Sequence, residues 1–598
     1  MNKHEIPSRK DVPEEYKWDL SKLYKSNEEW EADLLKIDQL KEKFISFKGK
    51  LKDSSENLLN ALKAWEELDC TIEKVYHFAS LNHSADEGDA EFQTMEDRVM
   101  MKVTEVESQS SFFDPELLAI DENTINEWIN REEFKDFKIM LQKTLRFKKY
   151  TLSEKEERLL ALQMESGQTA HKTFSLLTNV DLNFGTVKEN GIEKPLTQTT
   201  WSSFMDSQDR NVRKEAYTKF YDVFEKNQNT LATLYAGSVN QDVFSARARG
   251  YKSSLEAALY GNKVPESVYR NLIDTVHKNF ATLHKYYSIR KRVLKVDELK
   301  HYDVYVPLVK TVKTHYTYEQ SVEVVRNALA VLGKEYTDTL CDGLLHGWAD
   351  RYENKGKRSG AFSSGGYVGY PYILLNYKDD VIRDVFTMAH EGGHSMHSFY
   401  SKNNNPYSCY SYTIFEAEVA STFNEELVFD YLLKNAKSKD EKAYLLSMRA
   451  GDILATLHRQ TMFAEYELKA HEMVENGQPL NAQVLRKIYR ELLEQYFGSE
   501  MHFENNSDME GLRIPHFYNA FYVYKYSTGI SAALALAKLV KTGDKQNIEN
   551  YFKFLKSGGS RYPIESLRIA GVDMESTQPI QSALDTFKEI VDELDKLL

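Results

Sequence analysis

The chain of 598 residues has 77 Lys and Arg against 91 Asp and Glu, a net charge of −14. Nucleic-acid binding needs clustered basic residues on a basic domain, so this charge argues against nucleic acid as the main partner. Hydrophobic residues at 41% and charged residues at 28% describe a soluble globular protein, and the scarcity of helix breakers, 27 Gly and 12 Pro, favours long helices over turn-rich β structure.

The start of the sequence lacks the apolar core of a secretory signal, and no run of about 18 apolar residues indicates a membrane span. The three cysteines, Cys70, Cys341 and Cys409, are odd in number and far apart, which argues against a disulfide framework. We therefore expect a cytoplasmic protein whose partners include neither membranes nor nucleic acid.

Helical periodicity dominates the first 200 residues, where apolar positions recur at spacings of three and four. This spacing predicts helices over Asn27–Leu51, Glu56–Ser84, Glu91–Ser111, Pro115–Arg146 and Ser153–Leu177. A hairpin is expected over Asn183–Leu196, because the pair Asn190-Gly191 between apolar flanks is typical of a two-residue turn. We place a soft boundary near residues 185–200 and expect two domains, 1–198 and 199–598.

The second half is again mainly helical. Predicted helices cover Arg210–Phe224, Asn229–Ala248, Pro265–Val293, 379–400, Ile414–Leu433, Phe521–Thr542 and Ser582–Leu598. The fourth of these begins with Asp379 or Asp380 as its N-cap. The Gly- and Ser-rich segment 355–377 interrupts the pattern and predicts loops followed by a short strand, Tyr372–Tyr377, which could pair with an extended peptide.

The helix over 379–400 contains His390-Glu391-Gly392-Gly393-His394. Histidines four apart lie on one helical face, so both imidazoles can reach one ion. Glu391 lies about 100° round the helix and can reach a water on that ion, as in the His-Glu-x-x-His pattern of metalloproteases. Each mid-helix glycine costs about 1 kcal/mol relative to Ala, a cost that close approach of another backbone or a substrate would explain.

A zinc ion needs a third protein ligand and an open position. His397 is unsuitable, because three ligands on one straight helix would span about 10 Å, too far for bonds near 2.1 Å. On the next helix Glu418 lies among apolar residues, where an unpaired charge is costly, so we choose it as the third ligand. Glu425 shares its face and is placed to orient a ligating His. We expect Glu416 and Glu426 to lie on a solvated face.

Together with other segments, this motif resembles oligoendopeptidase F, in the thimet oligopeptidase and neurolysin family of zinc metallopeptidases. The similar segments, which cover nearly the whole chain, are Val12–Leu20, Lys357–Phe362, Pro371–Leu374, His390–Tyr400, Ala417–Thr422, Arg459–Glu465 and His516–Tyr526. The set is highly specific, whereas the zinc motif alone does not discriminate between families. Gly392 departs from the family pattern, which usually has one Gly between the Glu and the second His.

The resemblance implies a mainly α fold: a large two-lobed helical ellipsoid with a deep substrate channel and a small β-sheet near the zinc helix, around a thermolysin-like gluzincin core. It implies one Zn²⁺ per chain, bound by His390, His394 and the Glu of the following helix, here Glu418. It also implies cleavage of internal bonds in short, unfolded peptides by a zinc-bound water that Glu391 activates. The domain 199–598 is then the catalytic domain, in a monomer or small homo-oligomer.

Hydrolysis at a metal builds an oxyanion, which O–H or N–H donors aimed at it stabilise by several kcal/mol. The resemblance implies that a His and tyrosines of the segment 514–526 supply these donors. By position His516, Tyr522 and Tyr524 are the best matches, and Tyr518 and Tyr526 are weaker ones.

Two alternatives stay open at this stage. A metal-dependent carboxypeptidase shares the His-Glu-x-x-His motif but trims one residue from a free C-terminus. A non-catalytic peptide-binding protein would keep the fold, but it has no need of a general base at Glu391.

Overall fold

The computed structural model describes residues 6–310 and 312–598. The chain folds into two compact units, and each is built from three separate stretches of chain. Unit 1 comprises Met1–Lys149, Lys313–Lys434 and Leu536–Val572, and unit 2 comprises Tyr150–Val312, Asn435–Ala535 and Asp573–Leu598. This division differs from the domain boundary placed near residue 198, and a separate catalytic domain over 199–598 stays a prediction.

Unit 1 is mainly helical and carries one small sheet. Its helices are α1 Asn27–Ile45, α2 Ser55–Ala85, α3 Ala90–Ser110, α4 Phe113–Leu118, α5 Glu122–Ile129, α6 Lys138–Leu145, α15 Tyr318–Ala328, α16 Lys334–Leu345, α17 Ile382–Lys402, α18 Tyr407–Tyr410, α19 Ile414–Lys434, α24 Lys545–Ser557 and α25 Pro563–Ile569. Its strands are β4 Ala349–Asp350, β5 Phe362–Gly365 and β6 Pro371–Leu374.

Unit 2 is also helical, with two small two-stranded sheets. Its helices are α7 Glu154–Gly167, α8 Thr169–Leu176, α9 Gln198–Met205, α10 Arg210–Lys226, α11 Gln228–Arg249, α12 Ser254–Tyr260, α13 Glu266–Lys278, α14 Phe280–Leu294, α20 Lys439–Ile453, α21 Gln460–Glu475, α22 Ala482–Phe497 and α26 Gln578–Leu597. Its strands are β1 Thr186–Glu189, β2 Ile192–Pro195, β3 Leu299–Lys300 and β7 Met501–His502. Helix α23, Tyr524–Lys541, begins in unit 2 and ends in unit 1.

The mainly α fold class is confirmed. No helix within the described ranges combines the length and apolar character that crossing a membrane requires.

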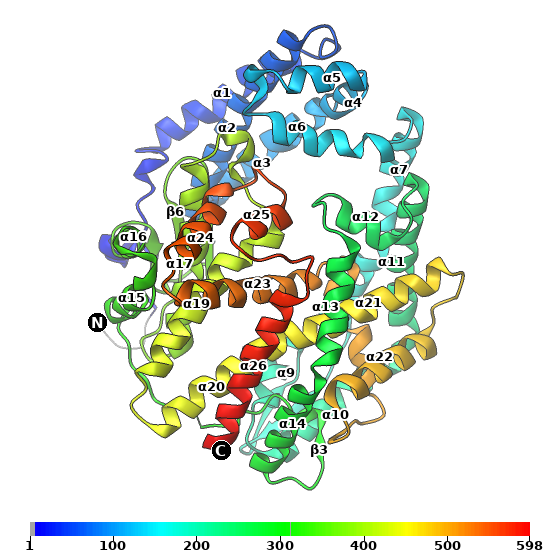
Figure 1. Ribbon diagram of the computed structural model, residues 1–598, viewed down its shortest axis with the longest axis vertical. Helices are drawn as coiled ribbons and strands as arrows, with labels where there is room; N and C mark the ends of the chain where they lie inside the picture. Colours follow the sequence, from blue (N-terminus) through cyan, green and yellow to red (C-terminus); the bar gives the residue numbers. More distant parts are fainter. Residues whose placement is uncertain (1–5, 311) are drawn as a thin grey trace. The chain divides into compact units, whose positions relative to one another are not determined.

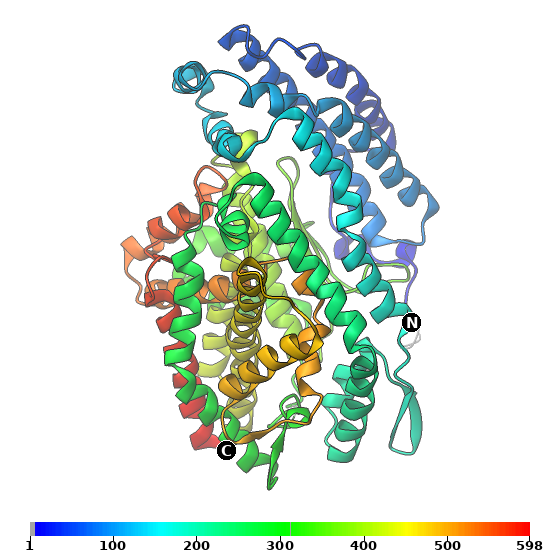
Figure 2. The ribbon, with the colours of Figure 1, turned by 90° about the vertical axis from the view of Figure 1, so that its right-hand side faces the viewer.

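In unit 1 the helices α1, α2 and α3 lie side by side, the blue group in Figures 1 and 2. Apolar residues at helical spacing, such as Trp30, Leu34 and Ile37 of α1, form a buried core that also contains Tyr372 and Leu374 of β6. This shared core anchors the small sheet to the helices of the N-terminal stretch.

The small sheet of unit 1 has the strand order β4-β6-β5. Strand β6 pairs in parallel with β4, aligning Ala349 with Ile373, and antiparallel with β5, aligning Gly365 with Pro371. The strand expected over Tyr372–Tyr377 is therefore the central one, and it has no open edge for an added peptide strand. Of the two outer strands, β4 has two buried residues, whereas β5 is partly exposed and is the one that could pair with a peptide.

Helix α24 packs on α17 and also contacts α19. The ring of Tyr551 stacks on Phe423 of α19, with centroids 4.1 Å apart, and Phe554 lies 5.0 Å from the ring of His397 on α17. The last stretch of unit 1 thus completes the surroundings of the two helices that carry the predicted metal ligands.

Several boundaries differ from the sequence prediction for local reasons. The helix expected over Pro115–Arg146 is divided into α4, α5 and α6, because the Asp121 side chain accepts the N–H groups of Asn123 and Thr124 and starts a new helix. The helix expected over Pro265–Val293 is interrupted at Asn279. The hairpin turn is confirmed, with left-handed φ values of 52° at Asn190 and 82° at Gly191.

The start of α17 was also expected a few residues early. The helix begins at Ile382, and its N-cap is Val381 instead of Asp379 or Asp380. The acidic residue in the first turn of the helix is Asp384, and its carboxylate accepts the backbone N–H of Lys378 at 2.8 Å.

Candidate active site

Helices α17 and α19 approach each other backbone to backbone at Gly393. A Cβ on this residue would lie 2.5 Å from the carbonyl oxygen of Ala420 and 2.6 Å from the Cα of Ser421. The neighbouring Gly392 instead faces the Leu340 side chain of α16, 3.1 Å from its would-be Cβ. Of the two glycines, Gly393 has the close backbone approach that the sequence analysis suggested.

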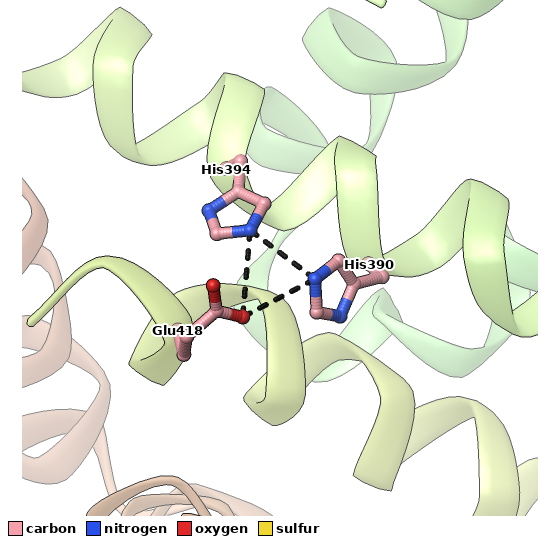
Figure 3. A group of neighbouring side chains, drawn as sticks. All are labelled: His390, His394 and Glu418. Atoms are coloured by element: carbon pink, nitrogen blue, oxygen red, sulfur yellow. Dashed lines mark hydrogen bonds and ion pairs between the residues drawn. The ribbon is translucent and has the colours of Figure 1, made fainter. Parts of the chain in front are cut away.

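This approach brings three predicted ligands together. The Nε2 atoms of His390 and His394 lie 3.2 Å apart, and Glu418 Oε2 lies 3.3 Å from the first and 3.7 Å from the second. All three side chains point to one position between the helices (Figure 3), and the three residues form a group able to hold a metal ion.

Hydrogen bonds orient the side chains of His390 and Glu418. His390 Nδ1 lies 2.5 Å from Glu425 Oε1, which directs Nε2 of this ring toward His394 and Glu418. The Ser421 hydroxyl donates to the Glu418 carboxylate at 3.4 Å and to its carbonyl oxygen at 3.0 Å. Glu425 therefore lies where the sequence analysis expected an orienting carboxylate.

Glu391 lies beside this group and is only 7% exposed. Burial raises the pKa of its carboxyl to about 7; His390 opposes this shift, and the carboxylates of Glu418 and Glu425 add to it. The backbone of Ser363 in β5 also hydrogen-bonds this carboxyl. A pKa near neutrality suits a group that accepts and returns a proton.

Two neighbouring glutamates were wrongly expected in solvent. Glu416 is 1% exposed and Glu426 is 2% exposed, so both lie in the interior and not on a solvated face. Glu416 accepts the Thr413 hydroxyl at 3.0 Å, and burial raises its pKa to about 7. Glu426 lies 3.6 Å from Lys541 Nζ, a partner that is 115 positions away in sequence.

His397, rejected as a ligand from helix geometry, lies outside the three-residue group. Its ring stacks on Tyr412 at 3.7 Å between centroids, with 6° between the planes, and it is 1% exposed. Burial lowers its pKa to about 3, so this His is a neutral packing residue.

The segment expected to supply oxyanion donors lies in unit 2, whereas the three ligands and Glu391 lie in unit 1. The rings of His516, Tyr522 and Tyr526 form a cluster: Tyr522 is 6.5 Å from His516 and 5.5 Å from Tyr526 between centroids. Tyr524 is not part of it. This residue is 1% exposed, and its ring lies 5.1 Å from Tyr269.

One residue that no sequence pattern indicated, Glu467, bonds to the backbone of this segment. Phe521 has a left-handed backbone, with φ of 56°, which is costly for a bulky residue. Its N–H donates to Glu467 Oε1 of α21 at 3.1 Å, and Glu467 is fully buried. Burial raises the pKa of Glu467 well above its usual range. Nothing in the sequence around Glu467 indicates that its side chain accepts the backbone N–H of Phe521.

A mainly helical fold and a His-Glu-x-x-His helix with a glutamate of the next helix beside its two histidines are typical of metallopeptidases. The model of a family described as Peptidase family M3 matches residues 203–586, and one described as Oligopeptidase F matches residues 116–184. The chain belongs to peptidase family M3, and it is a metalloendopeptidase.

Relatives along the full chain agree with this family. The chain is 42% identical to an oligoendopeptidase F homolog of Borreliella burgdorferi, over 99% of both chains. It is 40% identical to oligopeptidase PepF of Bacillus subtilis, over 100% of this chain and 89% of the relative. The resemblance to oligoendopeptidase F that the motifs indicated is confirmed.

Solved structures give the same result for the fold. A structure from Chlamydophila abortus matches with a TM-score of 0.94 and 36% identity, over 99% of this chain and 100% of that one. Oligoendopeptidase-F from Enterococcus faecium matches with a TM-score of 0.72 and 31% identity, over 96% and 99%.

Proposed function

We propose that this chain is a zinc-dependent oligoendopeptidase that hydrolyses internal bonds of short, unfolded peptides. The relatives named oligoendopeptidase F and oligopeptidase PepF support the class of substrate. The spacing of the three ligand atoms is the observation that carries the proposed metal site, and it fits zinc. Zinc bonds near 2.1 Å in a tetrahedron put neighbouring ligands about 3.4 Å apart, and the ligand atoms lie 3.2, 3.3 and 3.7 Å apart.

Two imidazoles and one carboxylate are a ligand set that suits zinc and leaves a fourth position for water. Zinc bound there would lower the pKa of its water toward 7 and supply positive charge. Glu391 takes a proton from the attacking water and delivers it to the departing amine. Glu425 holds the His390 ring in the orientation that points Nε2 at the ligand position.

His516 and Tyr522 are the proposed donors to the oxyanion, a role that the family resemblance implies. Their rings belong to one cluster, and the His516 side chain is exposed. Tyr526 adjoins both rings and is a closer companion of them than the buried Tyr524. We therefore reassign Tyr524 to packing and extend the donor group to Tyr526.

The test uses purified full-length protein and an internally quenched peptide blocked at both ends. Metal analysis should give one zinc per chain, and mass spectrometry should find an internal cut that a chelator abolishes and added zinc restores. Glu391→Gln should keep its zinc and lose at least about a thousandfold in kcat, since it lacks the group that transfers the proton.

Matched outcomes separate the alternatives. Glu418→Gln should lose zinc as well as activity, whereas Asp440→Asn, at an exposed α20 position, should lose neither. Loss of single C-terminal residues from unblocked peptides, with blocked peptides left intact, would indicate a carboxypeptidase. Full activity of Glu391→Gln would refute the proposed base.

A further inference from the structure

Unit 2 contains a pocket of about 230 Å³ next to the segment that carries His516. Its lining includes Arg513 and Pro515 on one side and residues of α8, α9 and the π-helical turn Leu177–Asp181 on the other. All of these residues belong to unit 2. The metal group and the proposed base do not contribute to this pocket, so it needs an explanation of its own.

Arg513 carries a positive charge that its neighbours do not balance. Glu510 is its acidic neighbour, but Glu510 Oε2 is already held by Arg459 Nη2 at 2.5 Å and by the Tyr489 hydroxyl at 2.8 Å. Arg513 Nη2 reaches the other oxygen, Oε1, only at 3.5 Å. Two arginines thus share one buried carboxylate, and one positive charge is left over.

The remaining contacts of Arg513 are with uncharged groups. Its Nε donates to the Tyr221 hydroxyl at 3.2 Å, and its guanidinium lies 5.1 Å from the Trp201 ring centroid. Among the described residues, Nη1 has no hydrogen-bond acceptor. The side chain is 16% exposed, so the planar group is held in place and an unused edge is accessible.

The opposite wall is held rigid by its own hydrogen bonds. Gln198 Nε2 donates to the carbonyl oxygen of Thr178 at 2.9 Å and to Asn179 Oδ1 at 3.0 Å. Asn179 Nδ2 in turn donates to the carbonyl oxygen of Ser175 at 2.9 Å. Thr178 and Asn179 lie in the π-helical turn, a rare element that occurs frequently at functional sites. This wall of the pocket is therefore held in place by hydrogen bonds before any ligand binds.

We propose that this pocket binds a carboxylate group of a peptide through Arg513. A planar guanidinium with a free N–H edge matches a carboxylate better than other groups of a peptide. The protein has a net charge of −14, which by itself repels anionic ligands, so selection of a carboxylate requires a local surplus of positive charge of this kind. The inference rests on the proposed function, because it takes a peptide as the ligand.

Two sources of the carboxylate can be distinguished with one short peptide that lacks acidic side chains. It is prepared as the free C-terminal acid, as the C-terminal amide, and as an amide whose last residue is Glu. Binding to zinc-loaded, full-length Glu391→Gln protein is measured by fluorescence anisotropy of an N-terminal label. The free acid should bind at least about tenfold more tightly than the plain amide, which corresponds to about 1.4 kcal/mol.

If the amide that ends in Glu binds tightly, the pocket also accepts side-chain carboxylates. If it binds weakly, the pocket accepts only the C-terminal carboxylate. In the same background, Arg513→Gln should abolish the preference for the acid. Asn179→Asp, at an exposed position, places a negative charge in the pocket wall and should reduce the preference without removing a buried side chain. Arg270→Gln, at an ion pair with Glu472 elsewhere in unit 2, is the matched control and should keep it.

Equal binding of all three peptides, or no binding of any, would overturn the inference, as would a preference that survives both pocket variants. These outcomes do not depend on hydrolysis, because the Glu391→Gln protein is used throughout. Failure of the proposed function would instead appear as absence of cleavage by the unmodified protein.

Discussion

The helix pair α17 and α19 and the segment 514–526 position their side chains in opposite ways. In the helix pair, His390, His394, Glu418 and Glu425 are arranged by regular helical turns and one close backbone contact at Gly393. In the segment, His516 and Tyr522 lie in irregular chain whose shape depends on a hydrogen bond from Phe521 to the remote Glu467. In the helix pair, the regular helical backbone positions the side chains. In the segment 514–526, their positions depend on one hydrogen bond to Glu467, a residue of another helix.

The difference has a physical consequence for mutation. A regular helix distributes the positioning of a side chain over many backbone hydrogen bonds, so disturbing it requires a steric clash. In an irregular turn only a few contacts fix the backbone, so the loss of one side chain can change the conformation of the turn. Substitutions at Gly393 and at Glu467 test these two cases.

The largest effect is expected from Gly393→Ala. The added Cβ would lie 2.5 Å from the Ala420 carbonyl oxygen, so the two backbones must move apart. Overpacking of this kind costs about 1–3 kcal/mol, and backbone contacts are the least able to yield. Because the movement separates Glu418 from the histidines, we expect at least about a hundredfold loss of kcat/KM, together with weaker zinc binding and a lower urea midpoint.

Gly392→Ala is the matched control one residue away. Its Cβ would meet only the flexible Leu340 side chain at 3.1 Å, and Ala is favoured over Gly in a helix by about 1 kcal/mol. This variant should retain zinc and nearly full activity. Similar losses in the two variants would contradict a special backbone contact at Gly393.

An intermediate effect is expected from Glu467→Ala. Without the acceptor for its N–H, Phe521 is free to leave the left-handed conformation, which costs about 1–3 kcal/mol to maintain. Tyr522, the next residue, would then lose its fixed orientation. We expect kcat to fall by about 10- to 100-fold while KM and zinc content change little. Steady-state kinetics measures kcat and KM separately, and metal analysis measures the zinc content.

Glu467→Gln should recover most of this activity. Burial raises the pKa of Glu467 and so favours its neutral carboxyl; the Gln amide is also neutral and supplies the same carbonyl acceptor. Glu472→Ala, on the same helix but with a side chain that is 42% exposed and paired with Arg270, should leave kcat unchanged. If Glu467→Gln were as impaired as Glu467→Ala, the hydrogen bond to Phe521 would not be the cause.

The smallest effect concerns stability alone, at Glu416 of α19. Its pKa is about 7 in the folded protein against 4.5 without burial, so the folded state retains a proton that the unfolded chain releases between these values. Stability therefore falls as pH rises from about 4.5 to 7 and stays reduced above that range. Glu416→Gln should raise the unfolding free energy at pH 8 by up to about 3 kcal/mol.

Urea denaturation between pH 5 and 8 measures this difference, which should shrink steadily toward pH 5. Glu426→Gln is the contrasting variant on the same helix. It removes a buried carboxylate that lies 3.6 Å from Lys541, so it should not stabilise the protein at pH 8. A pH-independent effect of Glu416→Gln would show that its burial does not govern its proton affinity.

The same contrast explains what could be predicted from the sequence. The long helices and the pairing of His390 with His394 follow from helical spacing, which a single sequence displays, whereas Glu418 was chosen for its apolar neighbours and from the family resemblance. The burial of Glu416 and Glu426 depends on neighbouring helices and, for Glu426, on Lys541, which spacing within α19 does not reveal. The later start of α23, at Tyr524 instead of Phe521, follows from the left-handed backbone that Glu467 holds.

Helix α24, which packs on α17 and stacks Tyr551 on Phe423 of α19, spans Lys545–Ser557 and begins more than 100 residues after α19 ends at Lys434. During synthesis on the ribosome, the histidine-bearing helix therefore emerges well before the helix that packs on it. Phe423 and His397 can contact Tyr551 and Phe554 only after this later stretch has been made. Until α24 has been synthesised, a nascent chain thus contains His390, His394 and Glu418 without the complete packing of the helices that carry them.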